Sequence, residues 1–174
     1  MQSDIPVIGF AAFSGTGKTT LLERLLPILT HSGVRIGMIK HAHHQFDIDT
    51  PGKDSYRLRK AGATQTLIAS TQRWALMTEN PVEDPPELVN LIQHLDQKHL
   101  DLILVEGFKQ AHIPKIELHR PGLGHPLLFP ADDNIIAIAT DTPLEIETDL
   151  PRLDLNQPEE IANFILVQYL EHSE

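Results

Sequence analysis

Residues 12–19 read Ala-Phe-Ser-Gly-Thr-Gly-Lys-Thr and contain the residue types that hold a chain of phosphates. Gly15 and Gly17 let backbone N–H groups approach phosphate oxygens closely, because glycine has no Cβ in the way. Lys18 can reach the β- and γ-phosphates, and the hydroxyl of Thr19 can bind magnesium. We therefore predict a site for a nucleoside triphosphate with Mg²⁺. Its predicted nucleotide-binding residues are Ser14, Gly15, Thr16, Gly17, Lys18, Thr19 and Thr20.

Two positions of this loop depart from the commonest pattern. Ala12 stands where the first glycine usually stands, and alanine fits there as long as the backbone angle φ is negative. Phe13 stands where some dimeric ATPases carry a lysine that reaches across the subunit interface, so that mechanism has no residue here. The sequence shows no obvious arginine finger near the loop, which predicts slow hydrolysis by the isolated chain.

Polar side chains follow several apolar runs and should meet at one edge of the sheet, because open parallel sheets bind ligands beyond the carboxyl ends of their strands. Lys40 follows the second run and is predicted to bind nucleotide. Glu106 ends Leu-Ile-Leu-Val-Glu, and we predict Glu106 and Thr19 as the metal site. The alternative for Glu106 is a solvated carboxylate at a strand end.

Three further acids are candidates. Asp49, or else Asp47, could orient the attacking water, and we predict Asp49 and Glu106 as catalytic; an ordinary loop acid is the alternative for either aspartate. Asp141 is predicted to bind nucleotide, because it follows a late strand where proteins with this loop often recognise the base. A carboxylate there can accept two hydrogens from guanine. Since the Asn-Lys-x-Asp guanine signature is absent, the residues do not decide between GTP and ATP.

The segment Lys40-His41-Ala42-His43-His44 is rich in donors and leaves three interpretations open. It fits a loop that binds an anion, a transition-metal site with imidazole ligands, or a plain polar loop. Lys53, Lys109 and Arg120 could contact a second anion, although exposed cations are common at such positions.

The elements that must position these residues alternate between strands and helices. Apolar runs predict strands over 5–13, 34–40, 66–69, 74–78, 100–105, 115–119 and 135–139. Helical spacing predicts helices over 18–30, 54–61, 87–95 and 159–170. Gly33 is expected to end the first helix, Pro27 to bend it, and Asp54 or Ser55 to cap the second. The pattern indicates an α/β fold: a P-loop NTPase three-layer sandwich with a mostly parallel sheet, helices on both faces and an inserted antiparallel strand pair.

The length, net charge and composition of the chain limit which kinds of partner it can bind. A chain of 174 residues suits a single P-loop nucleotide-binding domain over 1–174. The net charge of -10 argues against nucleic acid, because acidic surfaces repel phosphate backbones. There is no cysteine and no apolar run long enough for a membrane span, so we expect no thiolate metal site, no membrane partner and a cytoplasmic location.

Six segments in this order resemble the molybdopterin-guanine dinucleotide biosynthesis protein B (MobB) family. The Lys-His-x-His-His and Pro-Gly-Lys-Asp-Ser segments are together specific, whereas the phosphate loop is shared with many families. The resemblance covers about residues 5–141. The segments are Phe-Ser-Gly-Thr-Gly-Lys-Thr-Thr, Lys-His-Ala-His-His, Pro-Gly-Lys-Asp-Ser, Arg-Lys-Ala-Gly-Ala, Gln-Arg-Trp-Ala-Leu-Met-Thr-Glu and Leu-Val-Glu-Gly-Phe-Lys.

This resemblance implies a GTP-binding adaptor with weak, Mg²⁺-dependent GTPase activity in the last step of molybdenum cofactor synthesis, where molybdopterin guanine dinucleotide is formed. It implies two partner enzymes, the molybdopterin guanylyltransferase and the molybdenum-insertion enzyme, and leaves open whether molybdopterin itself touches this chain. It also implies a homodimer, with strands around 66–78 or 115–119 paired across the two subunits.

Two other functions stay open from the residues. A small-molecule kinase would use Asp49 and the histidine segment around an acceptor. A metal-insertion GTPase would hold its metal with His41, His43 and His44.

Overall fold

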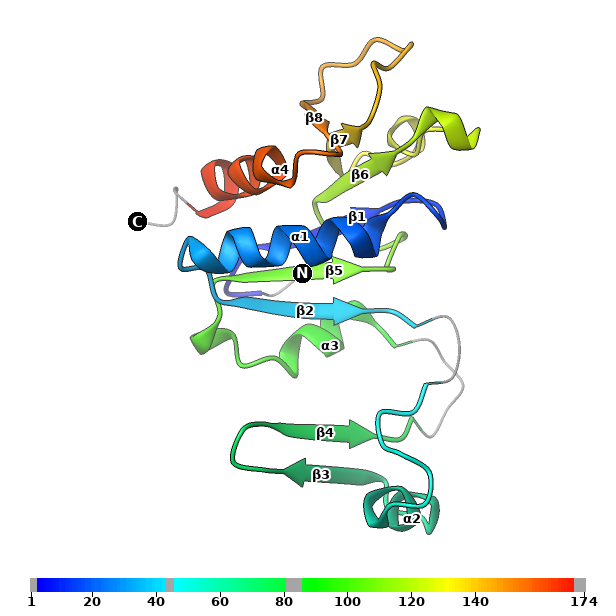
Figure 1. Ribbon diagram of the computed structural model, residues 1–174, viewed down its shortest axis with the longest axis vertical. Helices are drawn as coiled ribbons and strands as arrows, with labels where there is room; N and C mark the ends of the chain where they lie inside the picture. The colour runs from blue at the N-terminus through cyan, green and yellow to red at the C-terminus, as the bar shows by residue number, and fades with distance from the viewer. Residues whose placement is uncertain (1–2, 43–45, 81–85, 171–174) are drawn as a thin grey trace. The chain divides into compact units, whose positions relative to one another are not determined.

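The computed structural model describes residues 3–42, 46–80 and 86–170. Its main element is a six-stranded sheet in the order β2-β5-β1-β6-β7-β8, in which every neighbouring pair is parallel (Figure 1). The predicted fold class is confirmed, including the antiparallel pair β3-β4. The strands are β1 Val7–Ala11, β2 Ile36–Lys40, β3 Gln65–Ala69, β4 Trp74–Thr78, β5 Leu102–Glu106, β6 Lys115–His119, β7 Ile135–Thr140 and β8 Arg152–Asp154.

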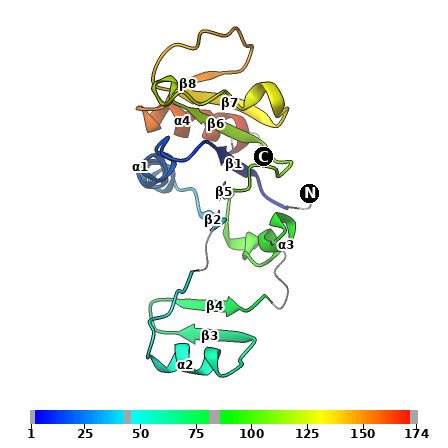
Figure 2. The same ribbon diagram turned by 90° about the vertical axis from the view of Figure 1, so that its right-hand side faces the viewer.

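Helices cover both faces of this sheet because its inner strands are apolar on both sides. On one face, Ile8, Phe10 and Leu104 pack with apolar residues of α1 (Lys18–His31) and α4 (Pro158–Ile165). On the other face, Ile103 and Val105 pack with α3 (Leu88–Gln93). Figure 2 shows α1 and α3 on opposite sides of β1 and β5. Alternate residues of one strand thus feed two separate cores.

The end of α1 follows the predicted glycine signal. Gly33 has a positive φ of 87°, and its N–H donates to the carbonyl of Thr30 at 3.0 Å. The N–H of Val34 donates to the carbonyl of Leu29 at 3.2 Å, which completes a Schellman motif. Pro27 lies inside this helix, which continues to His31, and the expected bend stays a prediction.

The described chain forms two compact units. One contains residues 1–41 and 87–174, and the other contains residues 42–86 with α2 (Asp54–Lys60) and the β3-β4 hairpin. The proposal of a single nucleotide-binding domain over 1–174 stays a prediction. Within the described ranges, no helix is long and apolar enough to cross a membrane.

Three expectations about the elements were wrong. Strand β8 was not predicted, because Arg152–Asp154 has no apolar run. The N-cap of α2 is Lys53, without a side-chain cap, and neither Asp54 nor Ser55. Strand β6 pairs with β1 on one side and β7 on the other, so residues 115–119 have no edge left for pairing across a dimer.

Lys115, at the start of β6, is a buried cation with 2% of its surface exposed. Its Nζ donates to the carbonyls of Lys109 at 2.9 Å and Ala111 at 2.8 Å. It also lies 2.6 Å from Oδ2 of Asp132. The three protons of the ammonium group therefore have three acceptors, as a buried charge requires.

Candidate functional site

The predicted phosphate loop connects β1 to α1. Gly15 and Gly17 have positive φ angles of 82° and 99°, in the region that glycine enters without strain. Ala12 is buried and does not share this conformation, as its identity predicts. The hydroxyl of Thr16 donates to the carbonyl of Phe13 at 2.9 Å and closes the loop.

The first turn of α1 follows directly. Its first backbone bond runs from the N–H of Leu21 to the carbonyl of Gly17, so the preceding N–H groups have no partner within the helix. Thr19 and Thr20 are exposed on this turn. Backbone donors and the positive end of the helix dipole fit a phosphate group.

Lys18 lies in a cluster of charges at this loop. Its Nζ is 3.5 Å from the carbonyl oxygen of Ala12. Partial burial lowers the pKa of Lys18, the neighbouring Lys109 and Lys40 lower it further, and Glu106 opposes the shift. Three ammonium groups face one carboxylate, so the net charge of the cluster favours an anion.

Glu106 ends β5 beside the end of β2. Lys40 and Glu106 are partners in the parallel ladder, and their side chains form an ion pair of 3.1 Å. The carboxylate side chain is only 13% exposed. A carboxylate together with the Thr19 hydroxyl gives the oxygen ligands that Mg²⁺ prefers, so these residues fit the predicted metal.

The residue after Glu106, Gly107, has to be a glycine for two structural reasons. Its φ is 96°, and a Cβ there would lie 2.9 Å from Cβ and 3.1 Å from the carbonyl oxygen of His41. The N–H of His41 donates to the carbonyl of Glu106 at 2.8 Å, and the rings of His41 and Phe108 lie 4.9 Å apart. The backbone after β2 is thus held against the backbone after β5.

Arg120 and Asp141 form a second polar group on the loop. The Nε of Arg120 donates to the carbonyl of Thr16 at 3.0 Å, and its Nη1 donates to Oδ2 of Asp141 at 2.6 Å. Arg120 therefore lies beside the loop, and the expected absence of an arginine finger stays a prediction. Arg120 and Asp141 follow the adjacent strands β6 and β7, and that adjacency was the signal available in the sequence.

Two side chains contact the ring of Phe13, and neither contact was predicted from the sequence. The rings of Phe13 and His125 are stacked, with centroids 4.5 Å apart and planes at 16°. Lys109 places its Nζ 4.9 Å from the centroid of the Phe13 ring, a cation–π contact. These contacts fix the side chain of a loop residue without using its backbone donors.

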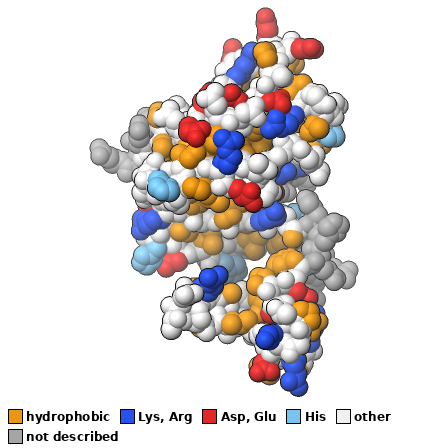
Figure 3. Space-filling view, in the orientation of Figure 1, with side chains coloured by type: hydrophobic (Ala, Val, Ile, Leu, Met, Phe, Trp, Pro, Cys, Tyr) orange, Lys and Arg blue, Asp and Glu red, His pale blue; other side chains and the backbone are white. Residues whose placement is uncertain are grey.

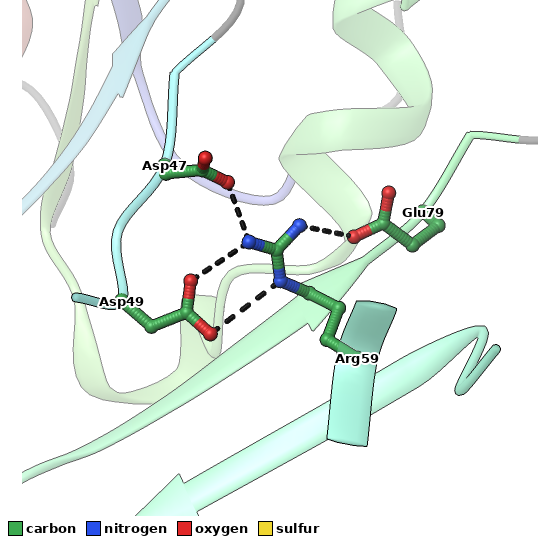
Figure 4. A network of polar contacts seen from close by, with 4 residues as sticks. All are labelled: Asp47, Asp49, Arg59 and Glu79. Carbon is green, nitrogen blue, oxygen red and sulfur yellow. Dashed lines mark hydrogen bonds and ion pairs between the residues drawn. The ribbon is translucent and has the colours of Figure 1, made fainter. Parts of the chain in front are cut away.

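Asp49 lies in the unit of residues 42–86, where it binds Arg59 together with Asp47 and Glu79 (Figure 4). The side chains of Arg59 and Asp49 are 7% and 3% exposed. The hydrogen bond from Arg59 lowers the pKa of Asp49. This cluster ties the loop before α2 to the end of β4, and the catalytic role of Asp49 stays a prediction.

Only part of the histidine segment falls within the described residues. His43 and His44 lie outside the described residues, whereas His41 packs on Phe108. Among the residues that the structure describes, no group of three His, Asp or Glu side chains could hold a metal ion. Lys53 is exposed at the start of α2.

Comparison with known proteins identifies the family. Residues 7–141 match the family model of molybdopterin guanine dinucleotide synthesis protein B, MobB. The molybdopterin-guanine dinucleotide biosynthesis adapter protein of Escherichia coli K12 is 55% identical over 163 residues, which cover 93% of this chain and 92% of that protein. The protein of the same name from Haemophilus influenzae is 47% identical, covering 95% and 90%.

Solved structures agree with the fold. The crystal structure of Bacillus subtilis MobB is 27% identical, has a TM-score of 0.72 and covers 95% of this chain and 98% of its own. HypB from Helicobacter pylori in complex with nickel is 16% identical with a TM-score of 0.52, covering 98% and 89%, so it supports the fold alone.

Proposed function

This chain belongs to the MobB family, and we propose that it is a GTP-binding adapter that assists the formation of molybdopterin guanine dinucleotide. The observation that carries the proposal is the convergence of Lys18, Lys40 and Glu106 on a glycine-rich loop at the carboxyl ends of β1, β2 and β5. The adapter role comes from relatives that carry that name and share about half of its residues.

In this proposal, the loop amides and Lys18 hold the phosphates, while Thr19 and Glu106 hold Mg²⁺, which neutralises phosphate charge. Asp141 reads the base. Its Oδ1 is buried and has no hydrogen-bond partner among the described residues, which supports an acceptor meant for a ligand. Guanine fits better than adenine, because guanine presents two adjacent donors to a carboxylate.

Hydrolysis is proposed to be slow. The sequence shows no obvious arginine finger near the loop, and such a finger is worth roughly 10³ to 10⁵ in rate. A partner protein would be needed for faster turnover.

The test is isothermal titration of GTP and ATP into the purified chain, with and without Mg²⁺. We expect GTP to bind more tightly than ATP, and Lys18→Ala to weaken GTP about 100-fold, because a charge-assisted contact to phosphate is lost. Lys98→Ala, an exposed lysine of the same unit, is the matched control. Binding of GTP by Lys18→Ala at the parental affinity would overturn the proposal.

The proposed protein partners are a second copy of this chain, the molybdopterin guanylyltransferase and the molybdenum-insertion enzyme, in the cytoplasm. The β3-β4 hairpin supports the second copy. Leu67, Trp74 and Leu76 share one face of the hairpin and are 61%, 68% and 45% exposed. Figure 3 shows hydrophobic side chains in orange at the surface of this unit. Each strand also has an edge that pairs with no other described strand, and such edges readily add a strand.

A further inference from the structure

Arg120 bridges three segments at the carboxyl edge of the main sheet. Besides its bonds to the Thr16 carbonyl and to Oδ2 of Asp141, its Nη2 lies 3.4 Å from Oδ1 of Asn156, which follows β8. The position of a Cβ on Gly17 would be 3.9 Å from Nη2. One guanidinium group therefore contacts both the phosphate loop and the acid assigned above to the base.

The two carboxylate oxygens of Asp141 differ in their hydrogen bonding. Oδ2 accepts from Arg120 at 2.6 Å, whereas Oδ1 is buried without a partner among the described residues. Asp141 also lines a cavity of about 330 Å³ formed by residues 140–144 and 152–154. Asp141 therefore has one oxygen engaged and one unpaired, and it belongs to the lining of this cavity.

The chemistry of the base makes Arg120 a competitor. Guanine donates two parallel hydrogens from N1 and N2, and a carboxylate receives both when each oxygen directs one lone pair at the base. The bond from Arg120 occupies one of the two lone pairs of Oδ2. A guanidinium group offers donors of the same kind in a similar fork. Adenine offers one amino donor beside an acceptor nitrogen, which a carboxylate repels, so adenine has less to gain from Asp141.

We propose that Arg120 competes with the guanine base for Asp141 and so sets how strongly the chain prefers guanine to adenine nucleotides. Arg120 is a specificity-determining residue in this proposal, which rests on the proposed binding of GTP. Base binding then breaks the pair with Asp141 and leaves the guanidinium group on the Thr16 carbonyl. The base and the phosphate loop are coupled through this one side chain.

The experiment compares the affinities of GDP and ADP, with Mg²⁺, for the parent, Arg120→Gln, Asp141→Asn and the double variant. Arg120→Gln should raise the ratio of GDP to ADP affinity about tenfold, because one charge-assisted bond no longer competes. The ratio removes any loss of phosphate attraction, which affects both nucleotides equally. Asp141→Asn should abolish the gain in the double variant.

Arg24→Gln is the matched control, because Arg24 is an exposed arginine of α1 in the same unit and does not line this cavity. If Arg120→Gln does not retain the parental melting curve, Arg120→Lys replaces it, and a smaller rise in the ratio is expected. An unchanged or lower ratio in Arg120→Gln, or an equal rise in Arg24→Gln, overturns the inference while the proposed function stands. A parent chain that binds neither nucleotide overturns both.

Discussion

Glu106 has two cationic partners, Lys40 in the structure and Mg²⁺ in the proposed function. In the structure it pairs with Lys40 at 3.1 Å, and the proposed function also assigns it to Mg²⁺. The partly buried position keeps water from screening either interaction. Glu106 is therefore the residue at which metal binding and the arrangement of Lys40 are linked.

Replacing Glu106 with Gln removes the charge while keeping the shape. We expect the gain in GTP affinity that Mg²⁺ provides to fall by about tenfold, as is typical when a group supporting a metal is changed. Titration with and without Mg²⁺ measures this gain. Glu145→Gln, at an exposed loop position, should keep the full gain. An undiminished gain in Glu106→Gln would remove Glu106 from the metal site.

Asp101 predicts how stability depends on acid. Hydrogen bonds from Arg35 lower the pKa of Asp101 from 3.8 to about 2. Because the folded pKa lies below the ordinary one, the stabilisation is complete above pH 3.8 and disappears as the pH falls through about 2. The free energy of unfolding of Asp101→Asn should therefore be lower than that of the parent near neutral pH. The two values should become equal as the pH approaches 2. Urea unfolding across that range measures the difference, and Asp133→Asn is the exposed control. A gap that is constant with pH would contradict the prediction.

Single residues also show how far sequence reasoning reaches into the site. The positions of Lys18, Lys40 and Glu106 were predictable, because the loop motif and the ends of apolar runs can both be recognised in the local sequence. The bond of Arg120 to Thr16 was not, because it depends on the distance between loops after β1 and β6. The side chains around Phe13 were missed for the same reason.

At the scale of elements, the C-terminal end of α1 depends on one backbone angle. A Cβ on Gly33 would meet nothing within 4 Å, so the only cost of Gly33→Ala is its positive φ. We expect a loss of about 1 kcal/mol in the free energy of unfolding. Gly122→Ala adds a methyl group in equally open space without a positive φ and should be nearly neutral. Chemical denaturation of both variants decides, and equal losses would show that φ is not the cause.

Elements with a clear local sequence pattern were predictable, whereas an element that depends on pairing with a distant segment was not. Strands β1 and β5 are apolar runs, and α1 has a phosphate loop before it and a glycine after it. Strand β8 has three residues, of which only Leu153 is buried, so it exists through its pairing with β7. Pairing between distant segments is tertiary information that local pattern does not contain.

At the scale of the whole molecule, the hairpin predicts the oligomeric state. We expect a mass of about twice 19.5 kDa in light scattering after gel filtration, because a second copy would cover Leu67, Trp74 and Leu76. Leu76→Lys places a charge on that face and should lower the mass toward one chain. Ile146→Lys changes an equally exposed apolar residue of the other unit and should leave the mass unchanged. A monomeric parent, or a dimer that survives Leu76→Lys, would count against the hairpin.

The three acceptors around Lys115 have a consequence for covalent labelling. Acylating reagents attack amines that reach solvent and give up a proton, whereas the Nζ of Lys115 is buried and donates to two carbonyls and Asp132. Lys115 should stay unmodified while an exposed lysine such as Lys98 reacts. The peptide that contains Lys115 then serves as an internal reporter, since it gains a label only when the start of β6 opens.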